Sequence, residues 1–484
     1  MIALSNKVLH RPPGYNLTRF LVPWRYFTDK TTISPTTLRM HSFRCSRYLF
    51  LLFLSLIAQG TLAQSTPPLR QIDAFIQQQY PSLGTLYKEL HQQPELSLQE
   101  EKTAARMAAE LKSLGFTVKE KMGAHGVVGV LKNGPGPTVL IRTDMDALPL
   151  EEKTGLPYAS RARGINAAGN EVNIMHACGH DIHMTVFVGT ARMLVELKNQ
   201  WKGTLVMVAQ SAEENGFGAD LMLKAGLFDF APQPDFAIAL HDNSFLPAGT
   251  LGYRAGAFMA SVDMMDITVR GQGGHGAAPH TTIDPVVLSA QLILAYQTIV
   301  SRSLNPIEPA VVTVGSIHGG TVHNIIPDEV KLQLTLRSYS DEVRQKTHQT
   351  IRRLSDNLAR AAGLPDDKLP IISLRDPMTP ATVNDPALTQ RLVGVFKSTF
   401  GEDKVVEMEP YMVGEDFSRF ALDNQVPICM FWLGTLAEET IRNAKEKNEQ
   451  LPSLHSPYFA PVPEPTIKTG VKAMSVAALN LFSK

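Results

Sequence analysis

Short apolar runs separated by helical segments constrain most strongly what this chain can fold into. The runs lie at residues 127–131, 138–141, 205–209 and 236–240. Segments whose apolar residues follow helical spacing separate several of these runs, notably residues 183–197. Continuous apolar runs of this length, alternating with helices, are typical of strands buried on both faces of a parallel sheet. The pattern predicts an α/β domain with a mainly parallel sheet, whose functional loops lie at the strand ends.

A helix before the first run carries signals at both ends. Apolar residues recur at helical spacing between residues 97 and 114. Ser97 and Glu100 have the spacing of a capping box, and Gly115 is a typical residue just past a helix end. We expect the helix to lie between these signals.

The pattern changes after residue 257, where a strand is expected at 262–269. The pair Asp284-Pro285 predicts a helix through about residue 301, because aspartate is a good N-cap and proline suits the first helical position. Further strands are expected at 311–314 and 330–336, and a helix at 341–362. This order predicts a small α+β domain.

We interpret that small domain as an insertion. The segment from about residue 377 onward contains acidic and histidine motifs that need partners in the first half of the chain. The predicted organisation is a catalytic domain in two parts, residues 64–257 and 375–484, with a smaller inserted domain at 258–374.

The first residues have the form of a signal peptide. Arg44 and Arg47 precede an apolar run at 49–58, and Thr61-Leu62-Ala63 follows it. The run is too short for a stable membrane anchor, so we expect cleavage after Ala63 and no anchor afterwards. Residues 1–63 are assigned to this region, with translation starting at Met40, and the mature protein is expected to be exported, either periplasmic or secreted.

Composition narrows the class of partner. Lysine plus arginine (46) balance aspartate plus glutamate (46), so the chain has no electrostatic reason to bind nucleic acid. Three cysteines exclude a disulfide-rich scaffold, and cleavage would remove Cys45. A small molecule or a short peptide is the expected partner.

The stretch MHACGHDIH, from Met175, places metal-ligand types in one loop. Cys178 and His180 are ligands that a divalent transition metal accepts. The spacing lacks the paired pattern of a structural zinc site, and a buried cysteine beside a helix-capping aspartate would be an ordinary structural feature. The loop alone leaves both interpretations open.

Ionisable residues also follow three predicted strands. Asp144 and Asp146 follow the strand ending at 141, Glu213 and Glu214 follow the one ending near 210, and His241 follows the run 236–240. Each has an ordinary explanation, such as a helix cap or a solvated face. Together they converge on one edge of one sheet. Adjacent glutamates suit a hydrolytic metal site, since one can hold the ion while the other acts as general base.

An ordered series of motifs resembles the M20 metallopeptidases, specifically the amidohydrolase branch with hippurate hydrolases and auxin-conjugate hydrolases. The stretches are LHQQPELSLQE (from Leu90), IRTDMDALPLEEKTGLPY (from Ile141), MHACGHDIH, QSAEEN (from Gln210), GGHGAAPH (from Gly273), GEDF (from Gly414) and LHSPYF (from Leu454). The resemblance runs from about residue 70 to the C-terminus. It implies a two-domain fold, with a dinuclear metal site in the larger domain and a lid domain that commonly also dimerises.

Carried over by position, the resemblance implies the following metal ligands: Cys178, His180, Glu214, His241 and His455. It makes Glu213 the general base, with Asp146 supporting the site. In the lid, His275 resembles a histidine that reaches the substrate carbonyl, often from the neighbouring subunit. Asn324 and Arg337 resemble substrate-binding positions, and a guanidinium suits a substrate carboxylate. Arg337 could equally be a surface charge of the lid.

The expected activity is metal-dependent hydrolysis of the amide bond of an N-acyl amino acid, or of a related small amide conjugate with a free carboxylate. Two divalent transition ions are expected, zinc or manganese before cobalt or nickel. The alternative within the enzymes is a metallocarboxypeptidase or dipeptidase acting on short peptides. A catalytically silent peptide-binding protein is a third hypothesis, although it would not need Glu213 beside Glu214. A homodimer through the lid is also expected from the resemblance.

Two positions depart from the branch pattern. QSAEEN has serine where proline is usual, and Ile182 stands where glycine is usual. Neither is a proposed ligand, but Ile182 could narrow the entrance, so substrate preference is not transferred.

Overall fold

The structure is a computed structural model that describes residues 69–483. The predicted signal region, residues 1–63, lies outside the described residues. Within the described part, no helix combines the length and the apolar character needed to cross a bilayer.

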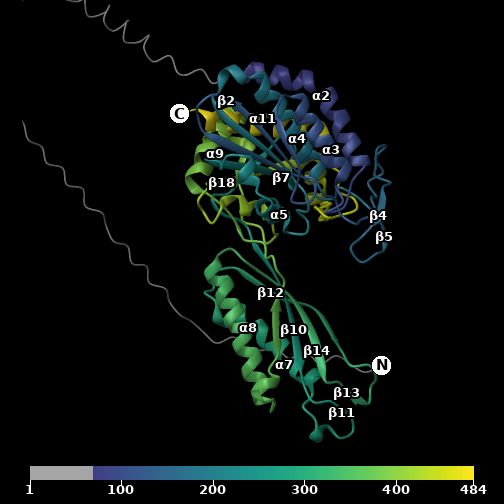
Figure 1. Ribbon diagram of the computed structural model, residues 1–484. Helices are drawn as coiled ribbons and strands as arrows, with labels where there is room; N and C mark the ends of the chain where they lie inside the picture. The colour runs from purple at the N-terminus through teal and green to yellow at the C-terminus, as the bar shows by residue number, and fades with distance from the viewer. Residues whose placement is uncertain (1–68, 484) are drawn as a thin grey trace, which may run out of the picture. The chain divides into compact units, whose positions relative to one another are not determined.

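An eight-stranded sheet forms the larger part of the protein, and Figure 1 shows helices on both of its faces. Its strands, in order across the sheet, are β1 (Thr117–Met122), β2 (Gly126–Asn133), β6 (Gly203–Gln210), β3 (Thr138–Asp144), β7 (Phe236–Pro247), β18 (Ile428–Leu436), β8 (Leu251–Tyr253) and β17 (Val405–Glu407). The central strands β6, β3, β7 and β18 run parallel to one another, while β1, β2 and β8 add antiparallel pairs.

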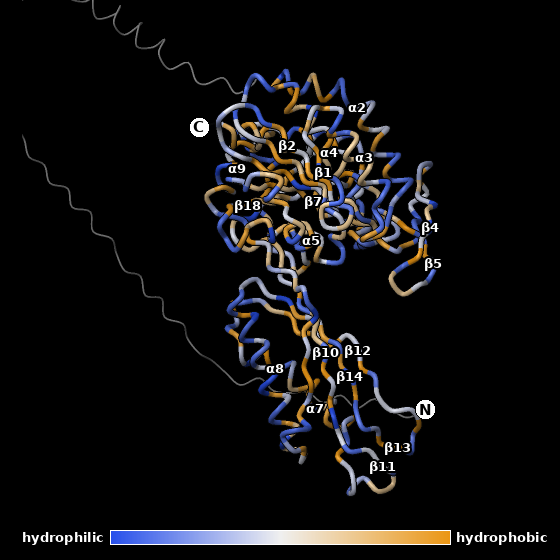
Figure 2. The backbone as a smooth tube through the Cα atoms, in the orientation of Figure 1, coloured by the Kyte–Doolittle hydropathy of each residue, from blue (hydrophilic) through white to orange (hydrophobic). Residues whose placement is uncertain are grey.

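Both faces of the central strands are buried, as the apolar runs predict. Along β3, Val139 and Ile141 belong to one core and Leu140 to the other, because successive side chains of a strand point to opposite faces. Each such side chain contributes about 1.5–3 kcal/mol by its burial. Figure 2 shows the apolar residues concentrated along these strands.

Helices cover the sheet. They are α2 (Leu69–Gln92), α3 (Glu101–Ser113), α4 (His180–Glu196), α5 (Gly218–Lys224), α6 (Leu227–Phe230), α9 (Pro386–Phe400), α10 (Glu438–Lys447) and α11 (Pro463–Phe482). Helices α2, α4 and α11 pack against one another. A hairpin of β4 (Arg163–Ile165) and β5 (Glu171–Asn173) leads toward α4.

The capping box predicted for α3 is wrong. Helix α3 begins at Glu101, and the N–H groups of Lys102 and Thr103 in its first turn donate to Glu95 rather than to Ser97. Ser97 instead donates to Asp146, and Glu100 accepts the N–H of Ala212. Both side chains therefore satisfy partners far away in the sequence rather than the helix end.

A second, antiparallel sheet carries a core of its own. Its order is β12 (Ala310–Gly319), β14 (Glu329–Ser338), β10 (Ser261–Arg270) and β15 (Ile371–Leu374). Helices α7 (Pro285–Thr298) and α8 (Asp341–Ala361) lie side by side against it in Figure 1. A two-stranded ribbon joins β11 (Gly274–His275) to β13 (Ile325–Ile326). The predicted start of α7 is confirmed, since Asp284 accepts the N–H groups of Val286 and Val287.

The chain enters and leaves this part through paired strands. β9 (Gly256–Met259) pairs with β16 (Thr382–Asn384), near the predicted bounds at residues 258 and 374. The bounds themselves stay predictions. Strands before and after this segment share the eight-stranded sheet, because β18 lies between β7 and β8.

Candidate metal centre

Three loops bring the predicted ligands together at the ends of the central strands. Asp146 follows β3, the pair Glu213-Glu214 follows β6, and Cys178 lies just before α4. Helix α4 begins at His180 after Gly179, whose φ of 80° favours glycine. A Cβ at Gly179 would also lie 2.2 Å from Asp242 Oδ2, so the close approach of the loop to β7 requires glycine there.

The five predicted ligands and the predicted base form one cluster. Ligand atoms within 4.8 Å of one another come from the sets Cys178, His180 and His241; Cys178, Glu214 and His455; and His180, Glu213 and Glu214. Cys178 Sγ lies 3.7 Å from His241 Nε2. His455 Nε2 lies 3.5 Å from Glu214 Oε2. The structure thus gathers all of these side chains, and their individual roles stay predictions.

Backbone carbonyls orient two of the histidines toward this cluster. His180 Nδ1 lies 2.8 Å from the carbonyl oxygen of Asp146, and His241 Nδ1 lies 2.9 Å from that of Asp242. A carbonyl oxygen only accepts, so each Nδ1 carries a proton, and Nε2 is the ring nitrogen left to ligate a metal. This arrangement is typical of histidines that ligate a metal.

Two buried atoms in the cluster test whether the site suits a metal. His180 Nε2 and Glu214 Oε1 are buried and have no hydrogen-bond partner among the described residues. Buried polar atoms are normally paired, so both need a partner that the protein does not supply. Nitrogen, oxygen and sulfur donors together fit a divalent transition metal.

His455 reaches the cluster from the C-terminal part of the chain. Its φ is 64°, and its N–H donates to the carbonyl of Ala177 at 2.8 Å. Its side chain is 55% exposed, so this ligand lies at the open side of the site. The backbone bond fixes it to the loop that carries Cys178.

Glu213 has the environment of a general base. Its side chain is buried, and burial together with Glu415 and Glu214 raises its pKa well above the usual range. A raised pKa lets a carboxylate take up a proton near neutral pH. Burial also raises the pKa of the Cys178 thiol, so binding of a metal as thiolate requires that a proton is released.

Asp146 supports the site through the backbone. It accepts the N–H of Glu213 at 3.1 Å and that of Glu214 at 3.0 Å. These bonds hold the backbone of the turn in place, and the supporting role of Asp146 stays a prediction.

A buried arginine beneath the glutamates was not predicted from the sequence. Arg142 Nη1 lies 2.6 Å from Asp144, and its Nη2 lies 2.9 Å from Glu415 and 3.1 Å from Asp416. The guanidinium offsets a group of carboxylates that would otherwise repel one another. Arg142 directly follows the apolar run 138–141, and two of its carboxylate partners, Glu415 and Asp416, lie far away in the sequence.

Hydrogen bonds within the protein engage both ring nitrogens of His183, which lies near Asp144 and His180. Its Nδ1 lies 2.7 Å from Asp144 Oδ1, and its Nε2 accepts the N–H of Asp242 at 2.9 Å. Both ring nitrogens of His183 therefore have hydrogen-bond partners within the protein, although His183 lies about one helical turn after the predicted ligand His180.

The predicted residues of the insert occupy two places. His275 and Asn324 come together in the β11–β13 ribbon, where the N–H of Gly276 donates to the Asn324 carbonyl at 2.8 Å. His275 is exposed, and no hydrogen bond or ion pair within residues 69–483 joins it or Asn324 to the predicted ligands. The structure does not bring these two residues to the metal centre.

Arg337 lies near the C-terminal end of β14, beside the GEDF motif. It is half-buried, burial lowers its pKa, and it forms no ion pair with another described residue. A Cβ at Gly414 would lie 2.2 Å from Val262 Cγ2 and 3.3 Å from Arg337 Nη1, so this close packing of the GEDF motif against the insert requires glycine.

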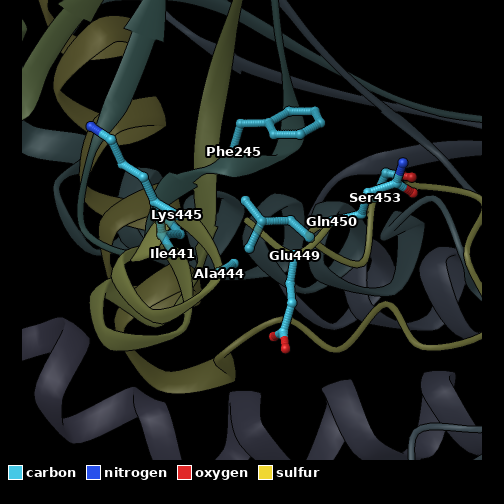
Figure 3. A pocket seen from close by; sticks show the side chains of 8 residues that line it. Phe245, Ile441, Ala444, Lys445, Glu449, Gln450 and Ser453 are labelled. Carbon is cyan, nitrogen blue, oxygen red and sulfur yellow. The ribbon is translucent and has the colours of Figure 1, made fainter. Parts of the chain in front are cut away.

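A hollow of about 400 Å³ lies between Phe245 and helix α10 (Figure 3). Phe245 stands on one side, and Ile441 and Ala444 stand on the other. None of the predicted ligands lines it, and neither does Glu213. The candidate centre is therefore separate from this hollow.

The profile of peptidase family M20/M25/M40 matches residues 140–477, well over half of the chain. This chain belongs to peptidase family M20. The predicted family is confirmed, and with it a metal-dependent hydrolase.

Relatives within the M20 family have several activities. Thermostable carboxypeptidase 2 of Saccharolobus solfataricus is 36% identical over 401 residues, which cover 82% of this chain and 94% of the relative. N-acetyl-L-cysteine deacetylase of Bacillus subtilis is 36% identical over 364 residues, which cover 73% of this chain and 82% of the relative. A relative named as a carboxypeptidase and one named as a deacetylase thus have the same 36% identity to this chain.

A solved M20 structure confirms the fold class. The YXEP protein of Bacillus subtilis, described as a dinuclear metal-binding peptidase, aligns with a TM-score of 0.66 and 28% identity. The alignment covers 84% of this chain and 99% of that protein. The mainly parallel sheet with a separate antiparallel insert is the M20 architecture.

Proposed function

We propose that this protein hydrolyses the amide bond of N-acyl amino acids, or of related small conjugates with a free carboxylate. The observation that carries the proposal is the convergence of all five predicted ligands on one cluster with the buried carboxylate of Glu213. Two divalent ions bound by these side chains would polarise the scissile carbonyl and make water more acidic.

The residues of this chain supply the proton transfers. Glu213 lies against His180 and Glu214 at the cluster, so it can take a proton from the attacking water. The raised pKa lets it hold that proton and then donate it to the leaving amine. Asp146 holds the Glu213 backbone in place during both transfers.

Arg337 supports a substrate with a free carboxylate. It is a half-buried guanidinium without an ion-pair partner in the described residues. A carboxylate would form paired hydrogen bonds with it. The deacetylase relative acts on an N-acetyl amino acid by its name, which is a substrate of this class.

The test is metal analysis of the purified protein with a matched substrate panel. The panel holds acetyl-, benzoyl- and indoleacetyl-amino acids, dipeptides, and the methyl ester of each N-acyl amino acid as the control that lacks a carboxylate. We expect metal-dependent hydrolysis of the free acids and much slower amide hydrolysis of the esters. Absence of amide hydrolysis with full metal occupancy would refute the proposal.

The second candidate is a carboxypeptidase or dipeptidase that acts on short peptides. The similarity to a thermostable carboxypeptidase favours it, and the same cluster would perform the chemistry. The panel separates the two, because a peptidase would have its highest kcat/KM on the dipeptides.

We further propose a homodimer formed through the insert. Helix α7 exposes Val287 (55%) and Leu294 (72%), which lie on one side of the helix at i and i+7. Strand β12 is an edge strand of the insert sheet, with β14 as its one neighbour there. Sedimentation velocity should give a dimer, and Leu294→Asp should give a metal-loaded monomer. A monomeric wild-type protein would refute this.

Export to the periplasm or to the medium is also proposed, from the predicted signal region. Mass measurement of the protein from its native cells should give a chain that begins at Gln64. A chain that retains residues 40–63 would refute cleavage.

A further inference from the structure

The loop that leads into α3 is joined to the turn that carries the two glutamates. Glu100 Oε1 accepts the N–H of Ala212 at 2.7 Å. Asp146 accepts the next two N–H groups, those of Glu213 and Glu214, at 3.1 and 3.0 Å. Three successive backbone donors are thus held by two carboxyl groups from different parts of the chain.

The turn needs this support because its first residue has an unusual backbone. Ala212 has a φ of 54°, in the left-handed region that residues other than glycine seldom adopt. Such a conformation persists only where the surroundings hold it. The bond to Glu100 is made at this residue, immediately before Glu213. It therefore fixes the direction in which the Glu213 side chain points from the turn that follows β6.

The same loop holds the second carboxyl group. Ser97 Oγ donates to Asp146 Oδ2 at 2.6 Å. Residues 97–100 therefore supply one of the carboxyl groups that bind the turn, that of Glu100, and contact the other, that of Asp146. This explains why the stretch LHQQPELSLQE, which contains none of the predicted ligands, belongs with the site.

Glu100 is suited to act as a neutral acceptor. Its side chain is fully buried, and Oε2 has no hydrogen-bond partner among the described residues. Burial and the neighbouring Asp146 raise its pKa to about 8. Adjacent buried carboxyl groups do not readily ionise together. The carbonyl oxygen of a neutral carboxyl group is sufficient to accept the Ala212 N–H.

We propose that Glu100 is a positioning residue for the reaction: it holds the Ala212 turn so that the Glu213 carboxylate faces the substrate and the attacking water. This inference rests on the proposed function, in which Glu213 is the general base. Within residues 69–483, no side-chain hydrogen bond or ion pair joins Glu100 to a predicted ligand.

A matched pair of variants tests the proposal in the full-length, metal-loaded protein. Glutamine and methionine are unbranched and similar in length to glutamate, but only glutamine keeps an acceptor oxygen. Glu100→Gln should keep kcat within about threefold of wild type. Glu100→Met should lower kcat by about tenfold to a hundredfold, because a small displacement of a catalytic group costs that much. KM and metal content should change by less than about twofold in both variants.

A double-variant measurement shows whether the effect passes through Glu213. In a Glu213→Gln background, Glu100→Met should lower the residual kcat by less than about twofold, because positioning a missing base has no value. A full multiplicative loss would overturn the proposal. Equal kcat for Glu100→Met and wild type would overturn it too, and so would an inactive, metal-loaded Glu100→Gln.

Two controls keep the outcome decisive. If Glu100→Met does not fold, Glu100→Asp replaces it, because the shorter side chain keeps the carboxyl group but withdraws it from Ala212. A folded Glu100→Asp with normal kcat would overturn the inference.

If Glu213→Gln itself stays fully active, the proposed function fails. If Glu213→Gln is inactive while Glu100→Met is normal, only this inference fails.

Discussion

Replacing Arg142 by methionine tests whether the buried arginine is needed to hold the carboxylates beneath the site. Its fully buried guanidinium contacts Asp144, Glu415 and Asp416 at 2.6, 2.9 and 3.1 Å. Removing one member of a buried ion pair costs about 3–5 kcal/mol, because it leaves an uncompensated charge. At about 2–3 °C for each kcal/mol in a domain of this size, Tm should fall by roughly 6–15 °C.

The loss should depend on pH in a definite direction. Burial already raises the pKa of Glu415 to about 7 and raises the pKa of Asp416, despite the presence of Arg142. Without Arg142 the folded-state pKa values rise further above those of the unfolded chain. A carboxyl group with a raised folded pKa costs no stability below its unfolded pKa; the cost grows as the pH rises from the unfolded pKa to the folded pKa and is complete above the folded pKa. The deficit of Arg142→Met should therefore be largest near pH 9 and shrink toward pH 5.

The measurement is thermal unfolding of both proteins from pH 5 to 9 at matched metal content. Arg106→Met is the control, since Arg106 is 41% exposed and pairs with Glu89 and Glu110 at the surface. It should cost less than about 1 kcal/mol at every pH. A variant Arg142→Met with the Tm of wild type, or a deficit that grows toward pH 5, would refute the reasoning.

Three further predictions concern the site. Glu213→Gln should keep its metal and lose at least about a hundredfold in kcat, because the amide preserves shape and removes the base; near-normal turnover would contradict the assignment. Metal affinity measured by calorimetry should rise with pH, because burial raises the pKa of the Cys178 thiol and the proton must leave on binding; affinity independent of pH in the wild type would argue against a thiolate ligand. His275→Ala should lower turnover without loss of metal, and mixing it with Glu213→Gln should restore part of the activity if His275 acts across a dimer; full activity of His275→Ala would remove both ideas.

Much of the centre could be predicted because its ligands follow strands. Apolar runs located β3, β6 and β7, and parallel strands place their carboxyl ends on one edge, so Asp146, Glu213 and Glu214 had to approach one another. His241 lies inside β7 and not after it, since the strand continues to Pro247. His455 could be found only through the family resemblance, because no local pattern marks it.

The residues that support the ligands were harder to predict. Ser97 and Glu100 have the spacing of a local cap, yet both bond to groups from distant segments. Local spacing cannot show that a distant group will bind these side chains in place of the helix end, because the partners meet only after the sheet has formed. Arg142 was missed because only Asp144 among its three carboxylate partners lies nearby in the sequence, while Glu415 and Asp416 come from a distant segment.

The position of β18 between β7 and β8 has a consequence for biosynthesis. β7 and β8 are synthesised first, followed by the whole insert, and only then does the strand that separates them leave the ribosome. The nascent chain must keep that place in the sheet open while β10 to β15 assemble. His455 follows β18, so the nascent chain lacks one of the predicted ligands until that strand has been made.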